Sequence, residues 1–208
     1  MKAKQQLYIV FLIITTLQMY GQESAHVSRV CRLPGKEVFP FVAVKTNLLY
    51  DLTATVNLGV EFRLSDYLSL DISGNYNPWT FPENKKWKHV LIQPELRYWV
   101  YEPFNGHFLG THFIYGIFNA GNLDLPLDIF PGLKDKRYHG KAFGAGISYG
   151  YQWILSPRWS MEASFGFGYM YMDYDIYDYE LYGQKQDEDV KHYFGPTKLA
   201  VSLIYIIK

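Results

Sequence analysis

Over most of its length the chain alternates apolar and polar residues with a period of two, in segments of roughly ten residues. In 54–64, for example, Leu58 and Val60 fall on one face, and the polar residues between and around them fall on the other. Successive side chains of a strand point to opposite faces, so this pattern predicts strands with one apolar and one polar face. We place eight of them, near residues 41–50, 54–64, 67–77, 89–101, 107–119, 140–155, 159–174 and 192–207.

Two all-β architectures are compatible with this alternation of apolar and polar residues. A soluble β-sandwich alternates too, but its core could not hide charges at mid-strand such as Glu61 and Arg97. A closed barrel satisfies its backbone within lipid and turns its polar faces inward. The 19 Tyr, 14 Phe and 5 Trp of the chain include several at predicted strand ends, as in the aromatic girdles of membrane barrels. The sequence therefore predicts an all-β fold, an eight-stranded antiparallel up-and-down transmembrane β-barrel.

The predicted connections alternate in length, as they do in bacterial barrels with short periplasmic turns and long outer loops. The tight ones are 65–66, 102–106 and 156–158, and the long ones are 78–88, 120–139 and 175–191. The connection 51–53 departs from this rule, because it is short at the position of an outer loop. An even number of strands places both ends of the mature chain in the periplasm.

The first residues are typical of a secretory signal peptide. Two lysines precede an apolar run of 11 residues from Leu7 to Leu17, and Gly21 offers a small residue for cleavage. A membrane anchor is the alternative, but a spanning helix needs about 20 residues. We expect a signal peptide at 1–21, a periplasmic linker at 22–38 and a barrel domain at 39–208, which places the protein in the cell outer membrane.

If the apolar faces meet lipid, the charged faces point into the barrel. An eight-stranded barrel has an interior only wide enough for side chains, and an unpaired charge there would be strongly destabilising. Cations and carboxylates are equally numerous on the inward faces, which favours a structural network of ion pairs that plugs the lumen. A catalytic carboxylate dyad or a proton path is the alternative. The residues assigned to the network are Lys45, Arg63, Arg97 and Lys198 with Glu61, Asp71, Glu95 and Glu162.

Other chemistry has little support in the sequence. The chain has 20 basic and 20 acidic residues. Removal of Lys2 and Lys4 with the signal peptide leaves a net charge of −2, which does not suggest binding to nucleic acid.

A barrel deacylase needs His and Ser two residues apart on a strand, but His26 and Ser28 lie in the linker. Cys31 is the only cysteine. We expect no catalytic residue, no metal site, no cofactor and no enzymatic activity; a lipid-A-modifying hydrolase or a narrow channel are the alternatives.

Two clusters in the predicted outer loops are not explained by the fold. The basic-aromatic cluster would lie level with lipopolysaccharide phosphates, although an ordinary solvated loop is the simpler interpretation. The Asp/Tyr-rich stretch offers contact area; its carboxylates could also hold calcium, but no glycine stands at the turn position of a calcium loop. The clusters consist of Lys85, Lys86, Trp87 and Lys88, and of Asp173, Tyr174, Asp175, Tyr177, Asp178 and Tyr179.

These clusters suggest a function carried by the loops. Exposed aromatic and charged residues on a rigid scaffold are the usual place for recognition. We expect a non-enzymatic barrel that presents its loops for surface interaction or assembly. The expected partners are membrane lipid, lipopolysaccharide and a surface-assembly protein.

Several stretches of the chain also match a known family. They are KTNLLYD at 45–51, DISGNYNPW at 71–79, NKKWKH at 84–89, QPELRYW at 93–99, FNGHFLG at 104–110, GYQW at 150–153 and HYFGPTK at 192–198. Through them the chain resembles a family of uncharacterised outer-membrane β-barrels, a domain of unknown function widespread in Bacteroidetes. Members of that family are often encoded near fimbrial or other surface-assembly components, so the resemblance implies a surface role. One departure is that many barrels end on an aromatic residue, whereas Lys208 ends this chain.

Overall fold

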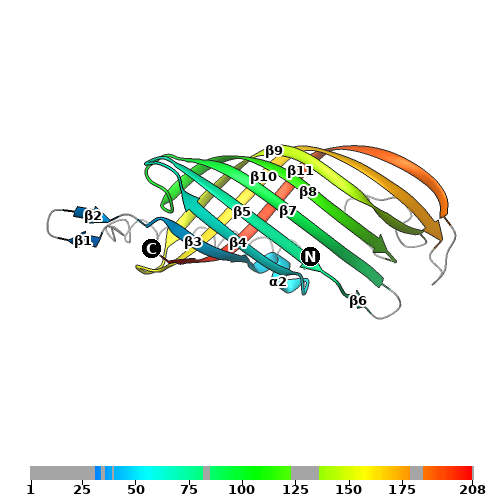
Figure 1. The fold of residues 1–208 in the computed structure, drawn as a ribbon, viewed down its shortest axis with the longest axis horizontal. Helices are drawn as coiled ribbons and strands as arrows, with labels where there is room; N and C mark the ends of the chain where they lie inside the picture. Colours follow the sequence, from blue (N-terminus) through cyan, green and yellow to red (C-terminus); the bar gives the residue numbers. More distant parts are fainter. Residues whose placement is uncertain are drawn as a thin grey trace, which may run out of the picture.

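The structure, a computed structural model, describes residues 31–33, 36–38, 40–81, 85–122, 136–178 and 185–207. Within them, eight antiparallel strands run up and down in one ring-like sheet (Figure 1). They are β3 (Val42–Asn47), β4 (Val56–Arg63), β5 (Leu68–Asn77), β7 (Lys85–Trp99), β8 (Gly106–Gly121), β9 (Lys136–Ile154), β10 (Trp159–Asp178) and β11 (Lys185–Ile206). Pairing of β3 with β11 closes the ring. The predicted all-β class, strand number and up-and-down order are thus confirmed.

Smaller elements accompany the ring. β1 (Cys31–Leu33) and β2 (Lys36–Val38) pair with each other inside the predicted linker. β6 (Thr80–Phe81) pairs with the start of β7, and α2 (Leu48–Leu52) is a short helix after β3. In the part of the chain that the structure describes, no helix is long and apolar enough to cross a membrane. The predicted signal peptide, residues 1–21, lies outside the described residues.

Each ring strand buries one face and exposes the other. Along most of β8, buried and exposed residues alternate one by one. The exposed face is apolar, with Phe113 at 61% and Ile147 at 70% exposure, whereas Glu61 and Arg97 in the interior are at 0%. A water-soluble protein shows the opposite distribution, since its large apolar side chains are mostly buried and its charges mostly exposed. The ring therefore has an apolar outer surface and a charged middle.

Several strands continue into segments predicted as loops. β7 begins at Lys85, β9 at Lys136 and β11 at Lys185, and β10 ends only at Asp178. Charge and polarity indicate contact with water, but they do not prevent a backbone ladder from continuing. The predicted loops 78–88, 120–139 and 175–191 are therefore too long at one or both ends, and strands β9, β10 and β11 extend well beyond β3, β4 and β5 (Figure 1).

β3 is much shorter than its neighbour β11. The alternation predicts a strand up to residue 50, but Asn47 ends β3 because its side chain caps α2, accepting from the Leu49 amide at 3.1 Å. β3 therefore pairs with β11 only from Ala43–Asn47 to Ser202–Ile206. Among the described strands, none pairs with Lys185–Val201 of β11 on this side. We refer to Lys185–Val201 as the unpaired edge.

The register that closes the ring can be tested with paired cysteines. Thr46 and Leu203 are directly opposite each other on β3 and β11, at a separation that a disulfide can bridge. In a Cys31→Ser background, Thr46→Cys with Leu203→Cys should form an intrachain disulfide, seen as altered migration on a non-reducing gel. Thr46→Cys with Ile204→Cys is the control, because its thiols point to opposite faces. A disulfide in the control but not in the test pair would contradict this register.

Candidate functional site

Charged side chains fill the middle of the ring. At their centre lies Arg97 of β7, which is fully buried. Its guanidinium nitrogens contact the carboxylates of Glu61, Asp71, Glu95 and Glu162 at 2.9, 2.9, 2.7 and 2.8 Å. A guanidinium offers five N–H donors in a fixed planar fork, which suits a residue that serves several carboxylates at once.

Two lysines complete this cluster from the strands on the other side. Lys45 of β3 donates to Glu61 and lies 3.4 Å from Glu162. Lys198 of β11 lies 2.8 Å from Glu95. Three cations thus face four carboxylates, a formal charge of −1. We refer to the set as the ionic network: Lys45, Glu61, Asp71, Glu95, Arg97, Glu162 and Lys198.

The strand register brings the carboxylates together. Glu61 and Asp71 are a direct pair across β4 and β5, and Asp71 and Glu95 are a direct pair across β5 and β7. Like charges in such positions repel each other. Arg97 follows Glu95 by two residues on the same face of β7, so its side chain can reach the whole row. The row of carboxylates therefore depends on this guanidinium for its charge balance.

Neutral serine donors hold two of the carboxylates in place. Ser69 donates to Glu61 at 2.5 Å, and Ser148 donates to Glu95 at 3.0 Å. Ser69 in turn accepts a hydrogen bond of 2.7 Å from the Trp99 indole. Hydrogen bonds to a charged acceptor are short and strong, so these two fix the orientations of Glu61 and Glu95. The alternation pattern predicts an inward face for Ser69 but does not reveal which residue it binds.

The structure brings together the residues predicted for the network, with Arg63 placed apart. Arg63 is the last residue of β4, and its Nη2 lies 3.0 Å from Asp66 in the following turn. Alternation predicts which face a side chain occupies but not how far along the ring it lies. An acidic residue three positions later offered Arg63 a local partner at the end of the strand.

An apolar layer covers the ionic network on the side of the tight turns. Trp99, Phe104 and Phe108 are all at 0% exposure. The Trp99 ring centroid lies 4.8 Å from that of Phe108 and 6.3 Å from that of Phe104. The Arg97 guanidinium lies 4.3 Å from the centre of the Phe108 ring, a cation–π contact. This layer separates the charges from water at the turn end.

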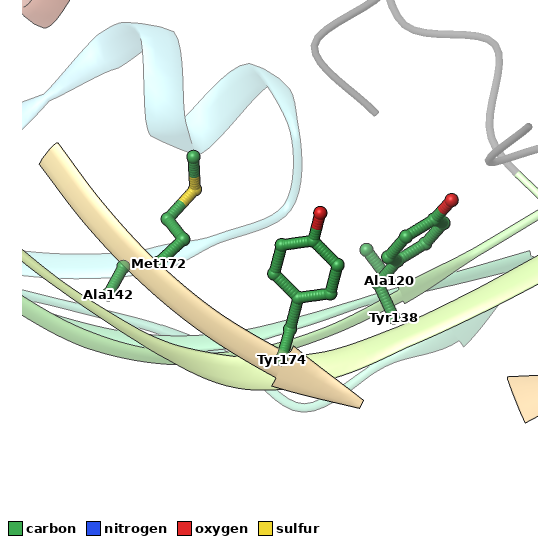
Figure 2. Packing of buried hydrophobic residues seen from close by; sticks show 5 residues of the cluster. All are labelled: Ala120, Tyr138, Ala142, Met172 and Tyr174. Carbon is green, nitrogen blue, oxygen red and sulfur yellow. The ribbon is translucent and has the colours of Figure 1, made fainter. Parts of the chain in front are cut away.

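The interior changes character on the other side of the network, toward α2. Figure 2 shows buried side chains of β8, β9 and β10 gathered on the concave side of the sheet; they are Ala120, Tyr138, Ala142, Met172 and Tyr174. A cavity of about 280 Å³ lies beside them. We refer to it as the apolar chamber; its lining includes Tyr50, Trp87, Leu91, Phe118, Ala142 and Met172. Charged side chains thus occupy the middle of the ring, whereas apolar side chains line this end.

Strand alternation divides the basic-aromatic cluster that was predicted as an outer loop. Lys86, Trp87 and Lys88 belong to β7. Trp87 packs against the buried apolar cluster of β8, β9 and β10, and successive side chains of a strand point to opposite faces, so Lys86 and Lys88 stand on the other face. The side chain of Lys85 lies outside the described residues. The cluster is therefore a strand segment with two separate surfaces.

The Asp/Tyr-rich stretch is divided in the same way. Tyr174 is buried in the apolar cluster and donates to Asp189 at 3.1 Å. Asp175 and Tyr177 lie on the opposite face of β10, where the Tyr177 hydroxyl donates to Asp175 at 3.3 Å and its ring lies 4.6 Å from the Arg137 guanidinium. Asp173 is exposed on the same face. The side chain of Asp178 and the whole of Tyr179 lie outside the described residues.

The described residues form no metal centre, and one histidine lies in the charged interior. Across the described ranges, no group of three or more His, Cys, Asp and Glu is placed to hold a metal ion. His112 lies 3.7 Å from Glu95, and its Nε2 is 2.9 Å from the Thr197 hydroxyl. Thr197 stands at a register shift between β10 and β11, which explains its contact with the interior. His26 and Ser28 lie outside the described residues.

The dependence of the network on Arg97 predicts a large loss of stability in Arg97→Met. The variant leaves buried carboxylates without their main partner, which should lower the free energy of unfolding by about 3–5 kcal/mol. Urea unfolding in detergent micelles, followed by tryptophan fluorescence, measures this. Arg158→Met, in an exposed turn, is the matched control and should unfold at the unmodified protein's midpoint.

A second variant separates charge from packing in this experiment. Adding Glu162→Gln to Arg97→Met removes one of the stranded charges and should recover part of the lost stability. Equal stability of Arg97→Met and Arg158→Met, or no recovery in the double variant, would contradict the charge-balance argument.

Comparison with known proteins concerns nearly the whole chain. The sequence profile of a family described as "Protein of unknown function (DUF3575)" matches residues 7–207. No protein in the curated set matches the chain. Because the profile covers almost all of the 208 residues, the chain belongs to this family of proteins of unknown function.

Proposed function

We propose that the protein is a transmembrane β-barrel of the bacterial outer membrane that acts as a closed, non-enzymatic anchor and presents its protruding strands to a partner at the cell surface. The observation that carries the proposal is the inverted distribution of side chains, with large apolar groups outside and charges inside. Only a surrounding hydrocarbon phase makes that distribution favourable.

The outer surface supports membrane insertion. Leu109, Ile147 and Phe194 are 58%, 70% and 73% exposed, and other large apolar side chains are exposed on each of β4, β5, β7, β8, β9, β10 and β11. Soluble monomers rarely expose apolar patches of more than a few hundred Å². Aromatic pairs mark the turn end of this belt, where Trp159 and Tyr205 have ring centroids 5.0 Å apart. Such pairs suit the border between hydrocarbon and headgroups.

The interior favours a role as an anchor over the alternatives, a lipid-A-modifying hydrolase or a narrow channel. Each carboxylate of the ionic network contacts at least one cation, so none is available as a free general base, as a lipid-A-modifying hydrolase would require. An open channel would need a continuous aqueous path, but the network and the layer around Trp99 lie across the ring. The geometry therefore favours a structural plug.

The strand ends support a surface role. β9, β10 and β11 extend beyond the short strands β3, β4 and β5 (Figure 1). Lys86, Lys88 and Arg137 stand on the outward face next to the apolar belt, which suits contact with lipopolysaccharide phosphates. The resemblance to barrels of Bacteroidetes encoded near fimbrial or surface-assembly components supports a surface-assembly protein as the partner of these strands.

Insertion can be tested by fractionation and gel migration. The protein should sediment with the outer membrane after removal of its first 21 residues, and it should migrate faster unboiled than boiled, because a closed barrel resists detergent unfolding. A tag at 181–188 should be reached from outside intact cells, whereas one at 102–106 should not. Recovery in the soluble periplasmic fraction, with identical migration of boiled and unboiled samples, would contradict the proposal.

The surface role can be tested by shortening the protruding hairpin. Replacing residues 175–190 by a short Gly/Ser linker should leave membrane abundance and heat-modifiable migration intact, because the ring below keeps its pairing. The same change should abolish crosslinking to the surface partner or the assembly phenotype. If Glu95→Gln lost that phenotype at normal abundance while the shortened hairpin kept it, the function would lie in the interior instead.

A further inference from the structure

We propose that the apolar chamber binds one fatty-acyl chain of a membrane lipid, admitted sideways between α2 and β11. The inference goes beyond the anchoring role and rests on the proposed membrane location, since the bilayer supplies the chain. It combines the composition of the chamber, a second cavity at the unpaired edge and the ionic network that closes the space below.

The chamber suits a hydrocarbon ligand. Its walls are hydrocarbon, aromatic and thioether groups such as Leu91, Phe118, Met170 and Met172, and its volume is about 280 Å³. Water needs two to four polar partners to be held in a cavity; the polar residues of the lining are Tyr50, Lys88 and His89, and the others are apolar residues or glycine. Ligand pockets of this apolar kind occur in the mouths of β-barrels. The chamber is therefore a site for an apolar group.

A second cavity connects the chamber to the side of the ring. It has a volume of about 310 Å³ and is lined by Leu49 and Thr53 of the α2 region and by Pro196–Leu199 of the unpaired edge. Tyr50 and Trp87 line both cavities, so the two adjoin at these rings. Because β3 ends at Asn47, no described strand separates this cavity from the outer surface. A chain could thus pass from the bilayer to the chamber.

The unpaired edge is poorly suited to the alternative occupant, an added peptide strand. Pro196 removes a ladder donor, and a register shift lies beside it. The Asn47 side chain already occupies the edge, donating to the Leu199 carbonyl at 3.2 Å and accepting from the Val201 amide at 3.2 Å. Natural proteins use such devices to block strand addition. The side opening therefore favours a flexible chain over a β-strand.

The ionic network sets the depth of the site. The polar space between it and Tyr50 has a volume of only about 30 Å³, which is room for a water and not for a hydrocarbon chain. Burying methylene groups against charges would also be unfavourable. An acyl chain therefore ends in the chamber and does not pass through the ring.

Photolabelling tests this site directly. The folded protein in detergent is irradiated with a fatty acid that carries a diazirine at mid-chain, and the labelled residues are mapped by mass spectrometry. Label is expected on the chamber walls, at Leu91, Phe118 and Met172. Ala142→Phe, which fills the chamber, should reduce this label about tenfold or more. Ala145→Phe, on the exposed face of the same strand, is the matched control and should leave it unchanged.

The outcomes separate this inference from the proposed function. Label confined to the outer surface, for example around the hollow of about 480 Å³ near Leu109 and Ile147, would overturn the acyl site, as would equal label in both variants. Label that reaches the chamber only after residues 123–135 are shortened would also overturn the acyl site. In that case a segment of the protein itself, and not a lipid, would occupy the chamber of the unmodified protein. Heat-modifiable migration of the same samples reports membrane-barrel folding independently, and its loss in the unmodified protein would overturn the proposed function.

Discussion

Arg97 holds together carboxylates that would otherwise repel one another across neighbouring strands. Glu61, Asp71 and Glu95 stand in one row because the strand register aligns them, and Glu162 approaches from the far side of the ring. A charge buried without a partner destabilises a fold by several kcal/mol. The strands therefore have one register in which each carboxylate meets a cation, and a slip by a single residue would turn the charges outward. The network contributes specificity as much as stability.

The interior is layered around this network. Aromatic side chains cover it toward the turns, and an apolar chamber follows it toward α2. The layers follow from the narrow bore of an eight-stranded ring, in which each level along the axis holds only a few side chains. Charges gather in the middle level, where cations from β3, β7 and β11 can all reach the carboxylates. The narrow interior lets a few charged side chains fill the middle of the ring. It also limits the size of the apolar chamber beside them, which is about 280 Å³.

Strand number, order and the inward position of the charges could be predicted from alternation, because period two directly reports the two faces of a strand. The predictions failed where alternation carries no information. Asn47 fits a strand as well as a helix cap, and only its position before α2 decides between them. Arg63 has the right face but lies at the end of its strand. The apolar chamber was not predicted, because Met170 and Met172 are apolar residues on a strand whose outward face is also apolar.

The shortness of β3 also bears on how the ring assembles. Neighbouring strands from β4 to β11 follow each other in the chain, so the loop-closure entropy of each pairing is small. Closure instead joins Ala43–Asn47 to Ser202–Ile206, the contact with the greatest sequence separation and one of the shortest ladders. Contacts of this kind form late and slowly. We therefore expect an open, curved sheet to form before the ring. Pairing of β3 with β11 then closes this sheet.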